Sequence, residues 1–345
     1  VDGILGTGSF SWINEAIEEA MDGGCPRYFG DIDAPVEELP RVVTTPRYTA
    51  FLRIAEGCDN RCAYCVIPSL RGRYRSRAME DILTEAKHLA AGGVKELILI
   101  AQDVTRYGSD RYGRRRLSDL VEALCRIDGF HWIRLHYLYP DQIDGALIDT
   151  IAREEKVVKY LDIPIQHCSD RLLRAMHRRG TKAELEALFD ALRAKIPGVA
   201  LRTSLICGFP GETEDDFEEL CDFLRRQKLP RAGVFAFSPQ EGTEAAAMPG
   251  QVPEETVRRR MELLTDIQSR VMDEFNERLL GTVTEVLCEG FDEEQGRYRG
   301  RTWADSPDID GHLYFTAAAD VPAGAFVPVR ITGAADGDLL GEAKA

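Results

Sequence analysis

Residues 51–65 read FLRIAEGCDNRCAYC, a short strand-like run that leads directly into three cysteines. Cys58, Cys62 and Cys65 have the spacing C-x3-C-x2-C, and no fourth cysteine lies nearby. A structural zinc site uses four ligands, and a ferredoxin run has the spacing C-x2-C-x2-C with a partner cysteine. Three thiolates can instead hold three irons of a 4Fe–4S cube and leave the fourth iron open to a ligand. The motif therefore predicts a catalytic cluster, with zinc or unligated thiols as the alternatives.

The composition is typical of a globular protein without a disulfide framework. The chain has 345 residues, enough for two or three domains, of which 44% are apolar and 29% charged. The cysteines outside the motif are scattered, which is typical of a reducing cytoplasm. Neither a signal peptide nor an apolar stretch of about 20 residues is found. We therefore expect a cytoplasmic protein that does not enter a membrane.

Strand-like and helical segments alternate from Pro46 to about residue 237. The predicted strands are 51–55, 94–101, 132–137, 158–163, 199–207 and 232–237. The predicted helices are 79–91, 117–127, 141–153, 169–176, 182–194 and 213–226, with Asp141 and Thr213 as expected N-caps. Right-handed crossovers would make the sheet parallel. The fold class is thus α/β, a partial (β/α)6 TIM-like barrel with its chemistry at the carboxyl ends of the strands.

Both ends of the chain differ from this alternating part. Residues 1–43 contain one amphipathic helix, 12–21, and a Gly- and Pro-rich linker, so we expect a remnant of a preceding domain in a longer protein. Residues 44–280 would form the barrel core and end in a long helix, 254–280. Residues 281–345 contain short strand-like runs separated by glycines, which predicts a small all-β barrel.

Several polar side chains follow the predicted strands and are candidates for binding a ligand near the cysteines. Tyr64 could stack against a ligand on the open iron, or it could simply pack within the loop. Gln102 and Asp103 follow the second strand and could hold an ammonium or hydroxyl group, although Asp103 is equally typical of a turn. Gln166 and His167 lie in the equivalent place after the fourth strand, and a lone histidine is usually structural.

Two further segments complete the candidate site. Gly208 begins the sequence GFPGET, where glycines permit a close approach of the backbone and the following helix N-terminus favours anions. Thr213 at its end could be only an N-cap. Arg178, with Arg174 and Arg179, could clamp a carboxylate or a substrate backbone, as could the basic run 71–77. Both basic groups could equally be solvated loops.

Taken together, these segments resemble a known family. The cysteine motif with Tyr64 is similar to that of the radical S-adenosylmethionine enzymes. Longer stretches resemble their methylthiotransferase branch, and residues 281–345 resemble a TRAM domain. The stretches are IAEGCDNRCAYCVIPSLRGRYRSR (54–77), LILIAQDVTRYGSD (97–110), WIRLHYLYPD (132–141), YLDIPIQHCSDRLLRAMHRRGT (160–181) and LICGFPGETEDDFEEL (205–220). The resemblance covers residues 1–335 and implies that Cys58, Cys62 and Cys65 bind the cluster.

Within this branch the substrate is either an adenosine of transfer RNA or an aspartate of small-subunit ribosomal protein twelve. Residues 55–58, 101–103, 163–167 and 301–311 resemble the protein-modifying enzymes. The charge also favours a protein substrate. The chain carries a net charge of −15, and residues 281–345 contain 12 acidic and 5 basic residues. Such a module repels phosphate backbones, so RNA contact should not dominate, and it attracts a basic ribosomal protein. A transfer-RNA methylthiotransferase is the alternative, and a zinc-dependent ribosome-binding module a more distant one.

The resemblance also implies a mechanism. The open iron would chelate S-adenosylmethionine, and one electron from an external donor would yield a 5′-deoxyadenosyl radical. That radical would remove a hydrogen from the β-carbon of the target aspartate, and a methylated sulfur would be added there. The family holds a second 4Fe–4S cluster through three cysteines of its N-terminal domain, which Cys25 alone cannot supply. We therefore expect this chain to cleave the cofactor but not to insert sulfur.

Overall fold

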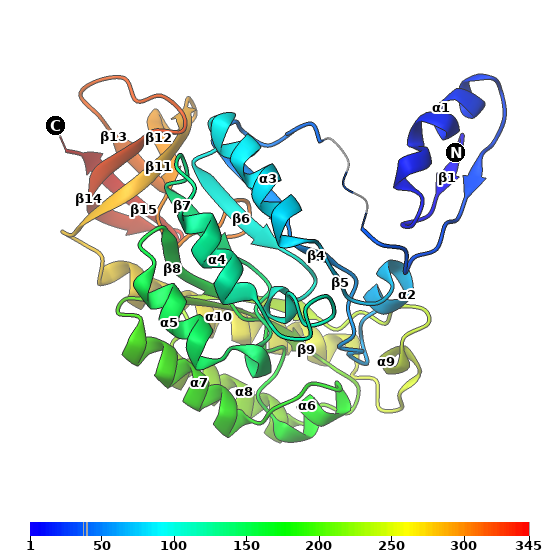
Figure 1. Cartoon of the computed structure of the whole chain (residues 1–345). Helices are drawn as coiled ribbons and strands as arrows, with labels where there is room; N and C mark the ends of the chain where they lie inside the picture. Colours follow the sequence, from blue (N-terminus) through cyan, green and yellow to red (C-terminus); the bar gives the residue numbers. More distant parts are fainter. Residues whose placement is uncertain (37, 39–40, 345) are drawn as a thin grey trace.

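A computed structural model describes residues 1–36, 38 and 41–344 of the chain. Within them, six parallel strands form one open sheet in the order β10-β9-β8-β7-β6-β3 (Figure 1). The strands are β3 (Thr49–Arg53), β6 (Glu96–Ile100), β7 (Trp132–Leu135), β8 (Val157–Asp162), β9 (Ala200–Cys207) and β10 (Arg231–Ala236). The predicted α/β partial barrel is therefore confirmed.

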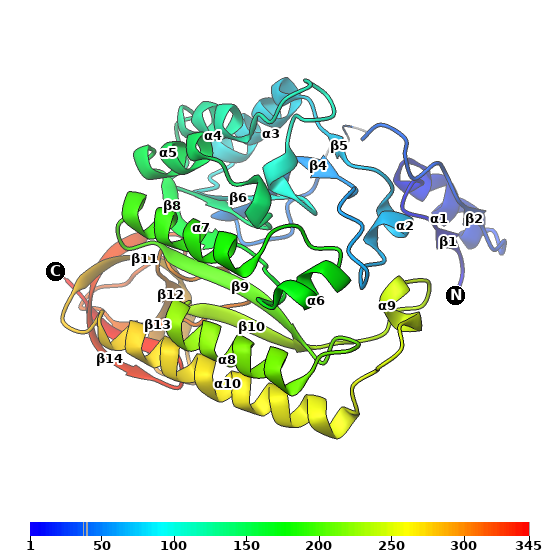
Figure 2. The same cartoon turned by 90° about the horizontal axis from the view of Figure 1, so that it is seen from below.

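Helices cover the outer face of this sheet (Figure 2). They are α3 (Met79–Ala91), α4 (Leu117–Cys125), α5 (Gly145–Arg153), α6 (Asp170–Ala175), α7 (Lys182–Lys195), α8 (Glu214–Gln227) and α10 (Glu254–Glu277). The short segments α2 (Ile67–Arg71), η2 (Val104–Arg106), η3 (Pro140–Gln142) and α9 (Glu244–Ala247) lie in the loops that follow the strands. Thr213 caps α8 as predicted. Asp141 does not cap α5, because it lies within η3 and Asp144 accepts the hydrogen bond from Leu147 N (2.9 Å) instead. No helix in the described ranges has both the length and the apolar character needed to cross a membrane.

The strand register determines which residues of neighbouring strands lie side by side near the carboxyl ends. It aligns a row of fully buried leucines that pack under the helices: Leu52, Leu99, Leu135, Leu161 and Leu201. Successive strand residues point to opposite faces, so the next residue of each strand belongs to the inner face. This inner row consists of Arg53, Ile100, His136, Asp162 and Arg202. It lies directly below the loops that leave the carboxyl ends.

The N-terminal residues form a small separate unit beside the carboxyl ends of the strands (Figures 1 and 2). It contains β1 (Ile4–Leu5), β2 (Arg27–Tyr28), η1 (Phe10–Trp12) and α1 (Ile13–Met21). The predicted helix is present, but Ala16 is its one buried residue, and its apolar face, which includes Ile17 and Met21, is exposed. Residues 37, 39 and 40 of the predicted linker lie outside the described residues.

Residues 283–343 form a closed five-stranded barrel, called here the C-terminal barrel, in the order β11-β12-β13-β15-β14. Its strands are β11 (Val283–Asp292), β12 (Arg297–Arg301), β13 (Leu313–Thr316), β14 (Phe326–Ala335) and β15 (Asp338–Ala343). The sequence pattern did not predict β15, which follows the tight Asp336–Gly337 turn and buries Leu339 and Gly341. The C-terminal barrel caps the amino-terminal end of the sheet, opposite the N-terminal unit (Figure 1).

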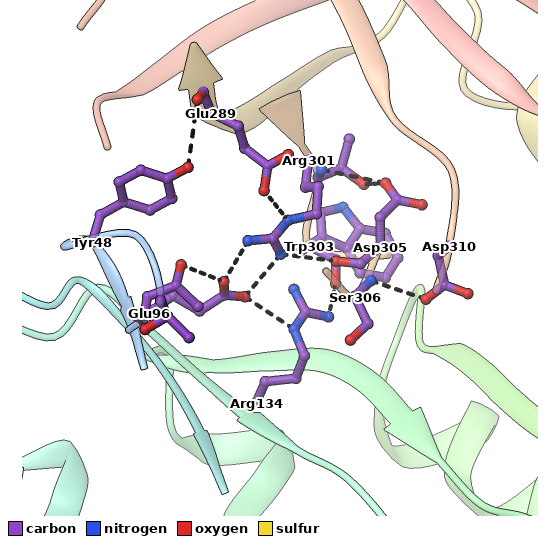
Figure 3. Close-up of polar contacts among 12 residues, drawn as sticks. Tyr48, Glu96, Arg134, Glu289, Arg301, Trp303, Asp305, Ser306 and Asp310 are labelled. Atoms are coloured by element: carbon purple, nitrogen blue, oxygen red, sulfur yellow. Dashed lines mark hydrogen bonds and ion pairs between the residues drawn. The ribbon is translucent and has the colours of Figure 1, made fainter. Parts of the chain in front are cut away.

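A buried ionic network joins the C-terminal barrel to the sheet (Figure 3). Arg301 donates to Glu96, the first residue of β6, at 2.6 Å, and Arg134 of β7 donates to the same carboxylate at 3.0 Å. All three side chains are at most 1% exposed. Arg301 also binds Glu289 (2.6 Å), and Arg134 donates to the carbonyl oxygen of Trp303 (3.0 Å). The network holds residues 301–311 against the inner face of the curved sheet.

The charge of Glu96 should therefore govern how stability depends on pH. Burial would raise the pKa of Glu96, but the attraction and hydrogen bonds of Arg301 and Arg134 lower it from 4.5 to about 2. A carboxyl with a depressed folded-state pKa stabilises the fold above its unfolded value, here pH 4.5. That stabilisation, on the order of 3 kcal/mol, is lost as the pH falls towards 2.

We expect Glu96→Gln to destabilise the protein by about 3 kcal/mol at neutral pH, because two arginines lose their buried counter-charge. Urea unfolding between about pH 7 and pH 3 should show this difference shrinking below pH 4.5. Asp222→Asn is the matched control, since its partner Arg225 (2.9 Å) is exposed. A difference that is independent of pH would contradict the assignment.

Candidate functional site

The cysteine loop, residues 57–65, leaves the sheet just beyond β3 through the short strand β4 (Ala55–Glu56), which pairs with β5 (Arg75–Ser76). Gly57 has φ +78°, and a Cβ there would lie 2.0 Å from the carbonyl oxygen of Arg73. Only glycine fits, so the predicted tight turn is confirmed. Cys58 N then donates to Gly72 O (3.1 Å), which folds the loop back on the segment that follows it.

The three cysteines lie on this loop with partly exposed side chains. Across the described ranges, no three Cys, His, Asp or Glu side chains converge on one point that could hold a single metal ion. Burial raises the pKa of the free Cys58 thiol to about 11. A bound metal would have to displace this proton.

Polar contacts tie the cysteine loop to the end of β6. Asn60 Nδ2 donates to Asp103 Oδ2 (2.8 Å), and Arg179 donates to Asn60 Oδ1 (2.9 Å). The other Asp103 oxygen caps η2 by accepting from Thr105 N (3.1 Å). Both Asp103 oxygens are thus engaged, which gives Asp103 a role in positioning the loop, and its contact with a ligand stays a prediction.

Gln102, the neighbour of Asp103, is the stronger candidate for ligand contact. Its Oε1 atom is buried and has no hydrogen-bond partner among the residues that the structure describes. A buried acceptor without a partner is costly, so a donor from a ligand would stabilise it. This unpartnered acceptor supports the prediction that Gln102 binds a cofactor.

Arg178 and Tyr139 form a cationic and aromatic wall beside Cys62. The Arg178 guanidinium lies 3.9 Å from the centre of the Tyr139 ring, and its Nη1 is 4.0 Å from Cys62 Sγ. Tyr139 Oη is 3.6 Å from the same sulfur. Burial raises the pKa of Tyr139, which keeps the phenol neutral. Arg178 was predicted as a carboxylate clamp; here it supplies positive charge next to a cluster ligand.

Tyr64 is half-buried in the cysteine loop, close to Cys62, Arg178 and Tyr139. It packs against an apolar group that includes Leu172 and Phe209. Burial raises the pKa of its phenol well above the usual value. Both alternatives for this residue, packing within the loop and stacking on a ligand, are compatible with this position, and the stacking role stays a prediction.

His167 and Gly208 have packing roles that the sequence did not reveal. His167 is fully buried, its Nδ1 accepts from Ser169 N (2.9 Å), and burial lowers its pKa to about 4. Such a neutral, enclosed ring does not support the predicted ligand contact. A Cβ on Gly208 would lie 2.4 Å from Val257 of α10, so this glycine permits a close approach of the helix. Its predicted role in cofactor binding stays a prediction.

The neighbouring predicted anion site and basic clamp are also corrected. A capping box between Thr213 and Asp216 already fills the N-terminus of α8 with a carboxylate. Gln166 has φ +72°, and its backbone continues the pairing with β9; ligand binding by its side chain stays a prediction. In the run 71–77, arginines pair with neighbouring carboxylates, as Arg77 does with Glu85 (2.7 Å), which makes the run part of the scaffold.

One polar pair on the inner row escaped the sequence analysis. Arg202 binds Asp162 at 2.6 Å, and Asp162 also accepts from Tyr137 N (3.0 Å). Both residues lie within strands that read as apolar runs, so periodicity alone gave no signal. A charged residue in the middle of an apolar run was the one available clue.

Comparison with known proteins agrees with this geometry. Residues 52–224 match the Radical SAM superfamily and residues 280–343 match the TRAM domain family. A ribosomal protein uS12 methylthiotransferase RimO from Pelotomaculum thermopropionicum is 49% identical over 99% of this chain and 78% of the relative. The RimO protein of Geobacter sulfurreducens is also 49% identical, over 99% of this chain and 77% of the relative. This chain belongs to the RimO family.

A solved structure supports the fold of this RimO-family chain. The radical S-adenosylmethionine methyltransferase TsrM from Kitasatospora setae, solved with tryptophan and an S-adenosylmethionine analogue, aligns with a TM-score of 0.51. The alignment covers 67% of this chain and 50% of TsrM at 17% identity. The superfamily implies a 4Fe–4S cluster and S-adenosylmethionine as cofactors. The three free cysteines on one loop, the unpartnered Gln102 acceptor and the Arg178 charge fit such a pair.

The charge of Arg178 leads to a test of its position. A cation close to a cluster ligand favours the reduced, more negative state of the cluster. We expect Arg178→Gln to lower the reduction potential by tens of millivolts. A redox titration of the reconstituted protein followed by electron paramagnetic resonance measures this shift. Arg174→Gln, in α6 just before Arg178, should leave the potential unchanged, and an unchanged potential in Arg178→Gln would refute the role.

Proposed function

We propose that this chain is the radical S-adenosylmethionine core of a methylthiotransferase that modifies the β-carbon of an aspartate in ribosomal protein uS12. One observation carries the proposal. The loop with the three cysteines lies at the carboxyl end of a parallel six-stranded sheet, in a chain 49% identical to uS12 methylthiotransferases. The βα layer places that loop directly above the inner row, where a substrate side chain can reach it.

The proposed roles follow from the position of each side chain. Cys58, Cys62 and Cys65 hold the cluster, which with S-adenosylmethionine supplies one-electron hydrogen abstraction when bound. Gln102 offers a hydrogen-bond acceptor to the cofactor, and Arg178 supplies charge beside Cys62. Asn60, Asp103 and Arg179 hold the loop in position.

The three predicted domains have separate tasks in this proposal. Residues 44–280 perform the radical chemistry, residues 281–345 recruit the substrate, and residues 1–43 belong to the methylthiotransferase domain. A second cluster would need three thiolates, and Cys25 is the one cysteine in residues 1–43. Its ligands would therefore lie outside this chain, and sulfur insertion would depend on them. The electron would come from an external donor in the cytoplasm, where ribosomal proteins are found.

The surface charge of the C-terminal barrel supports a basic protein substrate. Glu289, Arg301, Asp305 and Asp310 are turned inward in ion pairs. The remaining residues of 281–345 comprise nine acidic and four basic side chains. This surface would steer a Lys- and Arg-rich protein towards the chain and would repel an RNA backbone. A transfer-RNA substrate is the second candidate, and the acidic surface argues against it.

Iron content tests the proposed cofactors. After anaerobic reconstitution we expect about four irons per chain, because one cube is held by three cysteines. Cys62→Ser should lose most of this iron and the brown colour, whereas Cys25→Ser, at an exposed cysteine outside the loop, should retain both. About eight irons per chain would contradict the assignment of a single cluster.

Product analysis tests the substrate. The reconstituted chain should release 5′-deoxyadenosine under reducing conditions without adding sulfur. A complete RimO-family enzyme with this core should add a methylthio group to uS12 and not to transfer RNA, as measured by mass spectrometry. Methylthiolation of transfer RNA with uS12 unmodified would overturn the proposed substrate.

A further inference from the structure

Arg202, the third residue of β9, has one side of its guanidinium fixed and another side free. Its Nη1 donates to Asp162 Oδ1 at 2.6 Å and lies 3.5 Å from Ser204 Oγ. Its Nε is 3.9 Å from Asp310 Oδ1, beyond hydrogen-bond distance. Nη2 makes no hydrogen bond with any residue in the described part of the chain. Arginine binds carboxylates with two donors at once, and here the fixed Asp162 contact orients the free edge.

A cavity of about 240 Å³ lies against this free edge. Its walls come from β9, β10, α10 and the C-terminal barrel, and they include Arg202, Arg231, Gly233, Gln268 and Ile309. The walls also include three carboxylates, Asp310, Asp336 and Asp338. Arg231 is paired with Asp305 (2.7 Å), whereas Arg202 keeps its Nη2 for a ligand.

The inner face of the sheet is open beside this cavity. Phe235 follows Gly233 on the same face of β10, and a Cβ on Gly233 would lie 2.9 Å from the Phe235 ring. Phe235 is nevertheless 52% exposed, and Tyr137, whose backbone N binds Asp162, is 50% exposed. Two half-exposed aromatic rings beside an inner row of charged residues mark an open chamber. The chamber lies on the inner face of the strands, below their carboxyl ends.

The floor of the chamber is supplied by the C-terminal barrel. Its segment Ser306–Gly311, called here the floor segment, enters the sheet interior, where Ser306 Oγ lies 2.9 Å from His136 Nε2. Asp310 of this segment accepts from Tyr160 Oη (2.7 Å) and from Ser306 N (2.9 Å). These bonds hold the Asp310 carboxylate close to Arg202 but not in contact with it. Ile309 is 51% exposed and lines the cavity.

We propose that Arg202 binds the side-chain carboxylate of the substrate aspartate in this chamber, above the floor segment. The proposal rests on the function proposed above and adds a binding site to it. A target aspartate must turn its β-carbon towards the cofactors above the chamber, so its carboxylate points down towards the inner row. There the free edge of Arg202 meets it with two donors. The C-terminal barrel thus completes the substrate site in addition to attracting the substrate.

A peptide-binding experiment without any cofactor tests this site. Two fluorescent peptides carry the uS12 segment around the target, one with the native aspartate and one with asparagine in its place. By fluorescence anisotropy we expect the wild-type chain to bind the aspartate peptide about 10-fold more tightly, because a charge-assisted bond is lost in the asparagine peptide. Arg202→Gln should bind both peptides equally. Arg225→Gln, an exposed arginine on α8, is the matched control and should keep the preference.

A second variant guards against a simple loss of folding. Asp310→Asn removes the nearest competing charge while its amide oxygen can still accept from Tyr160 and Ser306, so the aspartate preference should rise about threefold. An undiminished preference in a folded Arg202→Gln chain would overturn the role of Arg202 and leave the proposed function intact. A wild-type chain that binds neither peptide would overturn the proposed substrate as well. Circular dichroism establishes that each variant is folded.

Discussion

The buried carboxylate of Glu96 is the constraint on which the arrangement of this molecule depends. An ionised group at the centre of a protein must have its charges paired, and Arg134 and Arg301 do this from two different domains. Such a pairing adds little net stability, yet removing one partner is costly, so it selects one docking geometry over others. In that geometry residues 301–311 lie against the inner face of the sheet (Figure 3). Asp310 of the floor segment comes within 3.9 Å of Arg202.

Contacts between distant residues also fix the geometry at the opposite end of the sheet, where they position the cysteine loop without a metal. The turn at Gly57 allows a contact with the backbone of Arg73 that no other residue permits, and Asp103 holds the loop through Asn60. The loop is therefore fixed by groups that are not ligands. Strand register then sets its height above the inner row, because Leu52, Leu99, Leu135, Leu161 and Leu201 must stay in one buried layer.

Features that depend on neighbours in sequence were predictable, and features that depend on distant partners were not. The strands, most helices and the turn at Gly57 follow from local periodicity and sterics. The contact of Gly208 with Val257 could not be predicted, because Val257 comes from a helix 49 positions later. The alternatives for His167 and Asp103 could not be separated by residue type, because burial and hydrogen bonds set their structural roles. Glu96 and Arg301 are 205 positions apart in the sequence, and no local pattern predicts that they pair.

Two elements share the recognition of the substrate, the acidic surface of the C-terminal barrel and the guanidinium of Arg202. They act over different distances. The acidic surface of the C-terminal barrel acts over about a Debye length, roughly 8 Å at physiological salt, so it accelerates encounter but cannot distinguish one residue of the partner from the next. A half-buried guanidinium acts only at contact and through a defined geometry. Selection of one aspartate in a basic protein therefore requires the second element. Because the floor segment belongs to the C-terminal barrel, the domain that attracts the substrate also shapes the chamber that selects it.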